Sequence, residues 1–586
     1  MKKKRWFHLL IVIGIYFGLL LLLQISESRA ADSPLKAPTE ITNLGSAVWY
    51  SIVTLTTVGY GDFVPRSFIG KVIGAFFAIC STFLVAFLIG IVLSLLRGRL
   101  LPIIRLFLSR KKRWYIFENH NSRADLLGKN LLEEHLGCVV IYAGSDTHGF
   151  FSLEASVKSV ISTELGVEEI LRYSLDKSKC TVFFLDDDSF DNYQRGSDLL
   201  EEGVTACCMT EYEPDHYPPS LILYDPYVSS ARTYWNRYPA NLSGETIVLI
   251  GSGKYAEAIL EQALTVNVFG PGQQLKYLAY GDYGEFRRNH PYLSQICRTV
   301  SINAAGAQNG QFRKADSAPH TDEQLVVDFA SANAAESEDG LFQKMDSASY
   351  ANAASADMIS APSTNDLLFF MDTPWNEDWE ALMSADRIIL CSEDEGDNLE
   401  AFNKIHRYMP ISAPIYARIS QGFDQVIPFG APEMLFTSEN VLRKKLDRWG
   451  MMLNNIYLRS QNLDSPKWEE LNAFLRRSNI ASADHLFTKV RILLGGEADS
   501  FLTKEVYASA YEAWRTEWPE KKDLFRWIEH ERWVRFYVMN NWQFNEVRDD
   551  AKRRHNMIRP FDCLSESEQA KDDYAWEMLG EIAKNI

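Results

Sequence analysis

Thr56-Thr57-Val58-Gly59-Tyr60-Gly61-Asp62 is the most informative stretch of this 586-residue sequence. Its two glycines accept backbone angles that a side chain would forbid, so successive carbonyl oxygens can face one axis. The hydroxyl of Thr57 can add a further oxygen at one end of that row. Val58 and Tyr60 can point away from the axis and brace the loop. The stretch therefore predicts a short ladder of oxygen ligands.

Two long apolar segments flank this loop. Trp6–Ile25 and Ile69–Leu96 are each long enough to span a bilayer at about 1.5 Å per residue. Between them, Gly45–Thr56 suits a short helix whose C-terminal end points at the loop. The sequence thus predicts two membrane spans with a helix and a loop between them. The expected supports of the loop are Trp49, Tyr50 and Asp62.

Basic residues set the expected orientation of the spans. Lys2-Lys3-Lys4-Arg5 precedes the first span, and seven Lys or Arg residues lie between Arg97 and Arg113, after the second. Such clusters stay in the cytoplasm, so both termini are expected there and the loop faces outside. An alternative is a signal peptide cleaved near Ser28-Arg29-Ala30-Ala31. The apolar core is longer than in a typical signal peptide, which favours the span.

Residues 1–110 resemble the pore domain of two-span potassium channels. The resemblance implies that Thr57, Val58, Gly59, Tyr60 and Gly61 form the selectivity filter of a homotetramer, with K+ as permeant ion. Val53 stands where some relatives carry a glutamate that pairs with the aspartate after the filter, so Asp62 needs another partner. Ser81 stands where relatives often have a hinge glycine. Ser81 and the deeper Gly90 are the candidate gate positions, although a glycine there can also serve close helix packing.

Composition narrows the remaining possibilities. The net charge is −17 although the membrane-proximal segments are basic, so the rest of the chain is strongly acidic, which argues against nucleic-acid binding. The eight cysteines are scattered without a Cys-x-x-Cys pair, as expected for buried thiols in a reducing compartment. Beyond the membrane part, the chain is long enough for three domains of ordinary size.

Short apolar strands then alternate with helices, which is typical of parallel α/β sheets. A first lobe, residues 111–240, has a predicted helix Leu126–His135 and the predicted strands Trp114–Glu118, Cys138–Tyr142, Thr181–Leu185 and Val204–Met209. A second lobe, residues 241–460, has the predicted strands Thr246–Ile250, Leu275–Tyr280 and Arg387–Cys391, and Ile415–Ile419 as the last. Two acidic loops of matching form, Asp186–Asn192 and Ser392–Asn398, indicate an internal duplication.

The second lobe carries a glycine-rich turn after its first strand, made by Gly251, Ser252, Gly253, Lys254, Tyr255 and Ala256. Gly251 makes the turn, Gly253 lets backbone approach a phosphate, and Asp282 can hold a ribose. The first lobe has Glu118–Arg123 at this place, so no ordinary dinucleotide is expected there. The alternative is a turn that serves only strand–helix packing. The two lobes resemble regulator-of-potassium-conductance (RCK) domains, which form a ring beneath such pores, and NAD, ADP or ATP is the candidate ligand.

Clustered carboxylates suggest a second kind of ligand. The acidic loops supply candidate calcium ligands, with solvated loops at strand ends as the alternative; they are Asp186, Asp187, Asp188, Glu393 and Asp394. An insert at 301–365, rich in Ala, Ser, Asn and Asp, reads as a flexible low-complexity expansion without a site.

Residues 465–586 have a helical pattern with motifs such as Trp468-Glu469-Glu470-Leu471, Glu529-His530-Glu531-Arg532-Trp533 and Pro560-Phe561-Asp562. This segment resembles the ryanodine-receptor (RyR) repeat domain. An aromatic and cationic pocket for a phosphate or a base is predicted, with a packed core and paired charges as the alternative. Its candidate residues are Trp533, Trp542, Arg548, Lys552, Arg554 and His555.

The sequence therefore predicts a multidomain chain: an α-helical membrane pore, two α/β Rossmann-like lobes and a small, mostly α-helical domain. Its expected function is that of a tetrameric potassium channel in the bacterial inner membrane, gated by a small-molecule ligand at the lobes or the RyR-like domain. A non-conducting membrane-anchored sensor is the alternative. An oxidoreductase is a third class, but no catalytic constellation is evident, so we expect no enzyme.

Overall fold

The computed structural model describes residues 2–31, 41–95, 100–144, 159–302, 364–423, 425–460, 462–464, 466–495 and 503–585. Most of the expected insert, residues 303–363, lies outside the described residues. The chain divides into two compact units, one formed by 1–111 with 143–174 and the other by 112–142 with 175–586.

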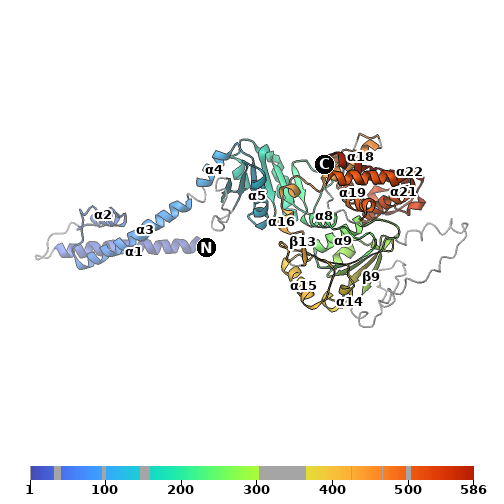
Figure 1. Ribbon diagram of the computed structural model, residues 1–586. Helices are drawn as coiled ribbons and strands as arrows, with labels where there is room; N and C mark the ends of the chain where they lie inside the picture. The colour runs from blue at the N-terminus through green and yellow to red at the C-terminus, as the bar shows by residue number, and fades with distance from the viewer. Residues whose placement is uncertain are drawn as a thin grey trace. The chain divides into compact units, whose positions relative to one another are not determined.

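The first unit is built mainly of helices. Its elements are α1 (Lys2–Ala31), α2 (Leu44–Leu55), α3 (Phe68–Leu95), α4 (Leu101–Ser109), β3 (Val160–Ser162) and α6 (Val167–Leu171). Helices α1, α2 and α3 lie side by side (Figure 1). They bury an apolar cluster that includes Leu23, Ala47 and Phe77. Among the described residues, one helical segment, Phe68–Phe87, is long and apolar enough to cross a membrane, judged by length and composition.

The first lobe of the second unit contains a parallel sheet. Its elements are β1 (Trp114–Phe117), α5 (Ser122–Glu134), β2 (Val139–Tyr142), β4 (Cys180–Phe184), α7 (Ser189–Leu199), β5 (Thr205–Met209), β6 (Leu221–Tyr224) and α8 (Pro226–Arg237). Neighbouring strands follow the order β2-β1-β4-β5-β6. Strands β1 and β2 are buried along their whole length, which explains their continuous apolar sequences.

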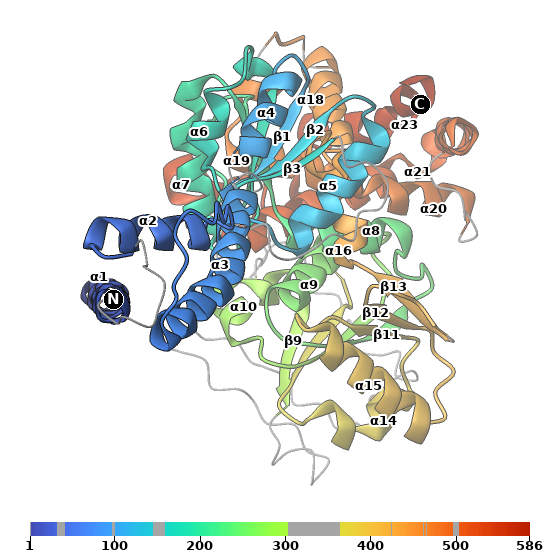
Figure 2. The same cartoon turned by 90° about the vertical axis from the view of Figure 1, so that its left-hand side faces the viewer.

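The second lobe repeats this plan around a seven-stranded parallel sheet of order β13-β12-β11-β7-β8-β10-β9. Its elements are β7 (Glu245–Ile250), α9 (Lys254–Val266), β8 (Leu275–Tyr280), α10 (Gly284–Asn289), β9 (Arg298–Ile302), β10 (Leu367–Met371), α14 (Trp379–Met383), β11 (Arg387–Leu390), α15 (Glu395–Tyr408), β12 (Ile415–Arg418), β13 (Val426–Phe429), α16 (Pro432–Leu435) and α17 (Ser438–Val441). Alternate residues of β7 pack on opposite faces, which α9 and α15 cover (Figure 2).

Two expectations for the second lobe need correction. Ile415–Ile419 is not its last strand, because β13 pairs with β12 at the sheet edge. The insert is also shorter than predicted at both ends. Ser301 and Ile302 complete β9, while Thr364 and Asp366 are buried beside β10. The strands β9 and β10 were not predicted, because they adjoin a segment of low-complexity composition.

The C-terminal part is helical and packs onto the second lobe. Its elements are α18 (Arg448–Ser460), α19 (Ala473–Asp484), α20 (Leu486–Leu494), α21 (Lys504–Met539), β14 (Gln543–Phe544), β15 (Arg554–His555), α22 (Glu566–Gln569) and α23 (Tyr574–Asn585). Helix α21 contains Pro519 and has a non-helical backbone at Lys521. The last turns of α21 share one apolar cluster with β7, β8 and α9 of the second lobe. The helical part is therefore fused to that lobe through a common core.

Candidate pore and ligand sites

The loop Thr57–Gly61 leaves the C-terminal end of α2 with three left-handed residues. The φ angles are +62° at Thr57, +59° at Gly59 and +73° at Gly61. Glycine adopts such angles without cost, whereas Thr57 must be held there by its surroundings. The backbone N–H groups of Val58 and Gly59 both donate to the carbonyl of Val53, at 3.0 and 3.2 Å. The end of α2 thus fixes the start of the loop.

Trp49 supports the far end of the loop. Its Nε1–H donates to Asp62 Oδ2 at 2.8 Å. Its ring also stacks on Tyr60, with ring centroids 6.3 Å apart and planes 5° from parallel. The sequence left Asp62 without a glutamate partner, because α2 has Val53 at the expected position. Asp62 instead accepts a hydrogen bond from the indole of Trp49, which also belongs to α2. Tyr50 contributes differently, since its hydroxyl lies against Gly74 of α3.

A carboxylate that sequence reasoning missed joins the end of α1 to the chain after the loop. Glu27 is fully buried. Its carboxylate accepts hydrogen bonds from the backbone N–H groups of Arg66 and Ser67, both at 3.0 Å, and from Ser67 Oγ at 2.6 Å. Ser67 directly precedes α3. A carboxylate near the end of a long apolar helix is rare, so its position in the sequence could have singled out Glu27 as a functional residue.

The two candidate gate positions lie in one continuous helix, α3. Ser81 is buried, and its hydroxyl donates to the carbonyl of Ala78 at 2.7 Å. Around Gly90, an added Cβ would meet no described atom of this chain within 4 Å. Whether either residue forms a gate stays a prediction.

The glycine-rich turn of the second lobe forms between β7 and α9. Gly251 approaches the neighbouring strand so closely that a Cβ there would lie 2.7 Å from the backbone of Cys391. Gly253 has φ +85° and precedes the first residue of α9, Lys254. Ala256 is fully buried in the core under the sheet. The turn therefore serves close strand–helix packing, whatever else it binds.

A pocket of about 440 Å³ opens at the carboxyl ends of β7, β8 and β10. Asp282 lies on its wall, and its role as a ribose-binding acid stays a prediction. Its backbone N–H donates to Ser252 Oγ at 2.9 Å, and its Oδ1 accepts from the N–H of Gly284 at 2.9 Å. The lining residues are Ile250, Gly251, Ser252, Tyr280, Gly281, Asp282, Met371, Asp372, Thr373, Pro374, Trp375 and Ser392.

The remaining turn residues already have partners. The backbone N–H of Lys254 donates to Glu393 Oε1 at 3.0 Å, and its ammonium pairs with Glu211, which follows β5 of the first lobe. Tyr255 lies beneath the guanidinium of Arg418, 4.3 Å from Cζ to the ring centroid. A residue of the first lobe, Glu211, therefore contacts the glycine-rich turn of the second lobe.

The carboxylates of the acidic loops cap helices and form hydrogen bonds and ion pairs with other residues of the chain. Asp188 caps α7 and Asp394 caps α15, each accepting two backbone N–H groups. Asp186 accepts from Asn119, and Asp187 pairs with Arg123. Within the described residues, no group of three or more His, Cys, Asp or Glu side chains could hold a metal ion. The calcium hypothesis is therefore unsupported, because these carboxylates serve helix caps and ion pairs.

The candidate pocket of the C-terminal part divides into two groups. Trp542 is buried and stacks on Phe474, and His555 packs edge-on against Trp533 with centroids 5.0 Å apart. Burial lowers the pKa of His555 to about 4, so its imidazole is neutral near pH 7. The aromatic residues therefore belong to a packed cluster.

Two of the three predicted cations of that pocket already form ion pairs. Arg548 pairs with Asp550 at 2.6 Å, and Lys552 pairs with Asp549 at 3.4 Å. Arg554 belongs to β15, and its backbone N–H donates to the carbonyl of Asp549 at 2.9 Å. The charges of Arg548 and Lys552 are therefore balanced locally by neighbouring aspartates.

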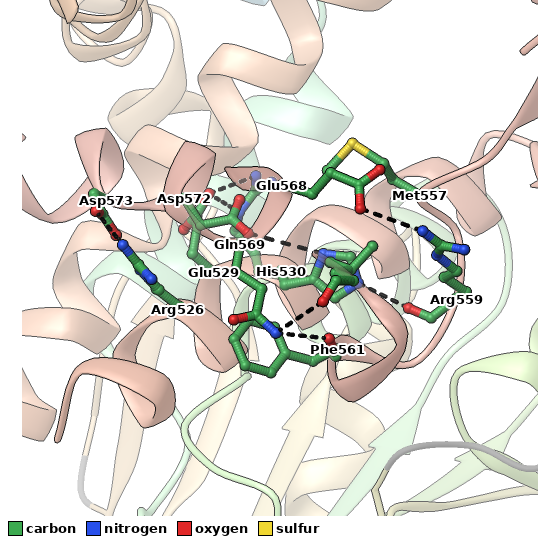
Figure 3. A network of polar contacts seen from close by, with 12 residues as sticks. Arg526, Glu529, His530, Met557, Arg559, Phe561, Glu568, Gln569, Asp572 and Asp573 are labelled. Atoms are coloured by element: carbon green, nitrogen blue, oxygen red, sulfur yellow. Dashed lines mark hydrogen bonds and ion pairs between the residues drawn. The ribbon is translucent and has the colours of Figure 1, made fainter. Parts of the chain in front are cut away.

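A buried polar network, which sequence reasoning missed, ties the C-terminal helices together. Glu529 accepts from Lys489 Nζ at 2.6 Å and from Arg532 Nη2 at 2.7 Å. Burial by itself would raise the pKa of Glu529, but Arg532 and Lys489 together lower it to about 2. Figure 3 shows the neighbouring part, where His530 bonds the Arg559 carbonyl and Arg526 pairs with Asp573.

Comparisons by sequence and by structure found similar proteins. The human "Voltage-gated potassium channel regulatory subunit KCNG1" is 41% identical over 66 residues, 11% of this chain and 12% of that protein. "Potassium voltage-gated channel protein Shal" of Drosophila melanogaster is 38% identical over 56 residues, 10% of each chain. This chain thus spans about a tenth of the length of these relatives.

Among solved structures, "Crystal structure of the GsuK bound to ADP" has 13% identity and a TM-score of 0.28, covering 74% of this chain and 99% of that one. "GsuK channel bound to NAD" has 12% identity and a TM-score of 0.24, covering 76% and 86%. A family model described as "Ion channel" (Ion_trans_2) matches residues 8–98. Residues 8–98, which contain α2, the Thr57–Gly61 loop and α3, therefore match an ion-channel family.

Proposed function

We propose that this chain is a subunit of a homotetrameric, potassium-selective channel. The observation that carries the proposal is the loop Thr57–Gly61, which leaves α2 with left-handed glycines and is braced by Trp49. The match of residues 8–98 to an ion-channel family and the potassium-channel relatives support it. Four such loops can replace the hydration shell of K+ with carbonyl oxygens.

In this proposal the first 110 residues form a two-span pore in a bacterial inner membrane, with both termini in the cytoplasm. The two Rossmann-like lobes, 111–240 and 241–460, form a cytoplasmic ring, and 465–586 is an RyR-like domain. A small-molecule ligand shifts the closed–open equilibrium by binding the two states with different affinity. The pocket beside Gly251 is the leading ligand site, and NAD, ADP and ATP are its first candidates.

The test is potassium flux from liposomes that contain the purified protein, with sodium as the control ion and each nucleotide added in turn. We expect selective potassium flux that one ligand alters. Gly59→Ala, which places a side chain at φ +59°, should abolish the flux while the tetramer persists. Gly137→Ala is a matched control, because Gly137 has φ +89° but lies after α5, outside the first unit.

The alternative is a membrane-anchored ligand sensor that does not conduct. The same experiment separates the two functions. Intact tetramers that pass no potassium under any condition, but still bind a nucleotide, would favour the sensor.

A further inference from the structure

The N-terminus of α9 is where a Rossmann fold places the phosphate of a bound nucleotide. Here a carboxylate of the protein occupies that place. Glu393 Oε1 accepts from the backbone N–H of Lys254 at 3.0 Å. A Cβ added to Gly253 would lie 2.7 Å from the same Oε1. The close approach that Gly253 permits is therefore used by Glu393.

The loop that carries Glu393 is held by hydrogen bonds that do not involve the Glu393 side chain. The Nε of Arg418 donates to the carbonyl of Ser392 at 2.9 Å, and its Nη2 donates to the carbonyl of Glu393. Asn398 bonds both the N–H and the carbonyl of Ser392. The side chain of Glu393 is exposed to solvent. Substitution at Glu393 should therefore change the charge at the turn without unfolding the loop.

The charges around the neighbouring pocket also oppose a phosphate. Asp282 and Asp372 belong to its lining, which includes no lysine or arginine among the described residues. The nearest ammonium group on the turn, that of Lys254, is paired with Glu211. The rest of the wall includes Trp375 and Met371, which offer an aromatic ring and a thioether to a base. The pocket therefore suits a neutral ligand with hydroxyl groups.

We infer that Glu393 is a specificity-determining residue that excludes phosphate from the Gly251–Lys254 turn, so that the pocket takes a neutral ribonucleoside. This inference rests on the proposed ligand pocket and replaces its first candidates, which all carry phosphate, with a ligand that has none. Asp282 accepts a ribose hydroxyl, and the base lies against Trp375. A phosphorylated ligand binds only after the Glu393 side chain rotates away, so its affinity is lower.

The test compares adenosine, ADP and NAD by calorimetry on the full-length protein and on two variants. Wild type should bind adenosine more tightly than ADP. Glu393→Ala, which leaves the α9 N-terminus open, should raise the affinity for ADP relative to adenosine about tenfold. Asp397→Asn removes one negative charge from the same loop at an exposed position and should leave the ratio unchanged.

Three results would overturn the inference: wild type that prefers ADP, an affinity ratio that Glu393→Ala does not change, or no binding of adenosine. Potassium flux, measured on the same preparations, keeps this result separate from the proposed function. If potassium flux persists but Glu393→Ala does not change the ratio of ADP to adenosine affinity, the inference is refuted and the channel proposal stands. Absence of flux refutes the channel proposal, whichever ligand binds.

Discussion

At the residue scale, Glu27 shows how one side chain can organise a loop distant in sequence. Its carboxylate is fully buried and holds two consecutive backbone N–H groups, those of Arg66 and Ser67. These donors lie directly before Phe68, the first residue of α3, next to the positive end of the helix dipole. Glu27 therefore fixes the two residues that precede α3 and joins them to the end of α1.

We predict that Glu27→Gln destabilises the first unit. The amide keeps one acceptor, but its NH2 group faces a backbone donor, so a buried N–H loses its partner at a cost of about 1–3 kcal/mol. The thermal midpoint of the detergent-solubilised protein should fall. Ser28→Ala is the control, since it removes only an exposed hydrogen bond to the carbonyl of Thr42. Equal midpoints for Glu27→Gln and wild type would refute this role.

At the scale of elements, the two acidic loops use the same device. In each, an aspartate caps the helix that follows, while an asparagine inside that helix bonds the loop and the next strand. Asn192 Nδ2 donates to the carbonyls of Asp186 and Met209, and Asn398 Nδ2 donates to those of Ser392 and Arg418. The duplication seen in the sequence therefore corresponds to a repeated hydrogen-bond pattern.

We predict that Asn398→Ala destabilises the second lobe by about 3 kcal/mol, because it removes three hydrogen bonds to backbone groups in a largely buried site. Chemical denaturation should show the change. Glu400→Gln, at an exposed position of the same helix, should have little effect. Calcium should leave the midpoint of wild type unchanged, and a clear calcium-dependent rise would restore the metal hypothesis.

At the scale of the whole second unit, buried arginines join parts that are distant in sequence. Arg535 of α21 is fully buried and pairs with Asp366 at 2.9 Å and with Glu531 at 3.1 Å. Asp366 also accepts from the backbone N–H of Leu275, the first residue of β8. One ion pair therefore holds a helix of the C-terminal part against the chain where β8 and β10 begin.

We predict that Arg535→Met destabilises the second lobe and the C-terminal helices together. Removing one partner of a buried pair costs about 3–5 kcal/mol, because the remaining carboxylate stays uncompensated. Hydrogen exchange should accelerate in both β10 and α21. Arg515→Met, at an exposed position of α21, should leave both unchanged. Faster exchange in α21 alone would mean that the two parts are independent.

The buried network also predicts acid sensitivity of the C-terminal helices. Burial and the nearby Lys489 ammonium lower the pKa of His485 from 6.5 to about 3, while the pKa of Glu529 falls from 4.5 to about 2. Above pH 6.5, the neutral His485 and the ionised Glu529 both make their full contribution to the free energy of unfolding. The His485 contribution is lost as pH falls from 6.5 toward 3, and that of Glu529 from 4.5 toward 2. The total is on the order of several kcal/mol.

The denaturant midpoint of the C-terminal helices should therefore be lower at pH 5 than at pH 7. His485→Gln should flatten this dependence between the two values, because the titrating imidazole is gone. His216→Gln, at an exposed position, should keep it. A midpoint independent of pH in wild type would refute the buried-histidine account.

The amino-acid sequence alone determined the local features of this protein. The glycine-rich loop, the apolar helix Phe68–Leu95 and the fully buried strands of both lobes arise from short-range patterns, so their positions could be predicted to within a residue or two. Among the strands of the two lobes, the prediction missed β6, β9, β10 and β13, and in β13 Pro428 argues against a strand. An edge position tolerates the missing N–H, and only the assembled sheet shows which strand lies at its edge.

Tertiary structure alone decided the polar partners. Glu27 meets Ser67 across 40 positions, Lys254 meets Glu393 across 139, and Arg535 meets Asp366 across 169. In the sequence, a charged side chain is interpreted as a solvated surface residue. Once the fold buries it, losing its water costs free energy unless a partner of opposite charge or a hydrogen-bonding group lies beside it. For the same reason, the sequence indicated a phosphate-binding turn at Gly253, whereas the folded chain brings a carboxylate to it.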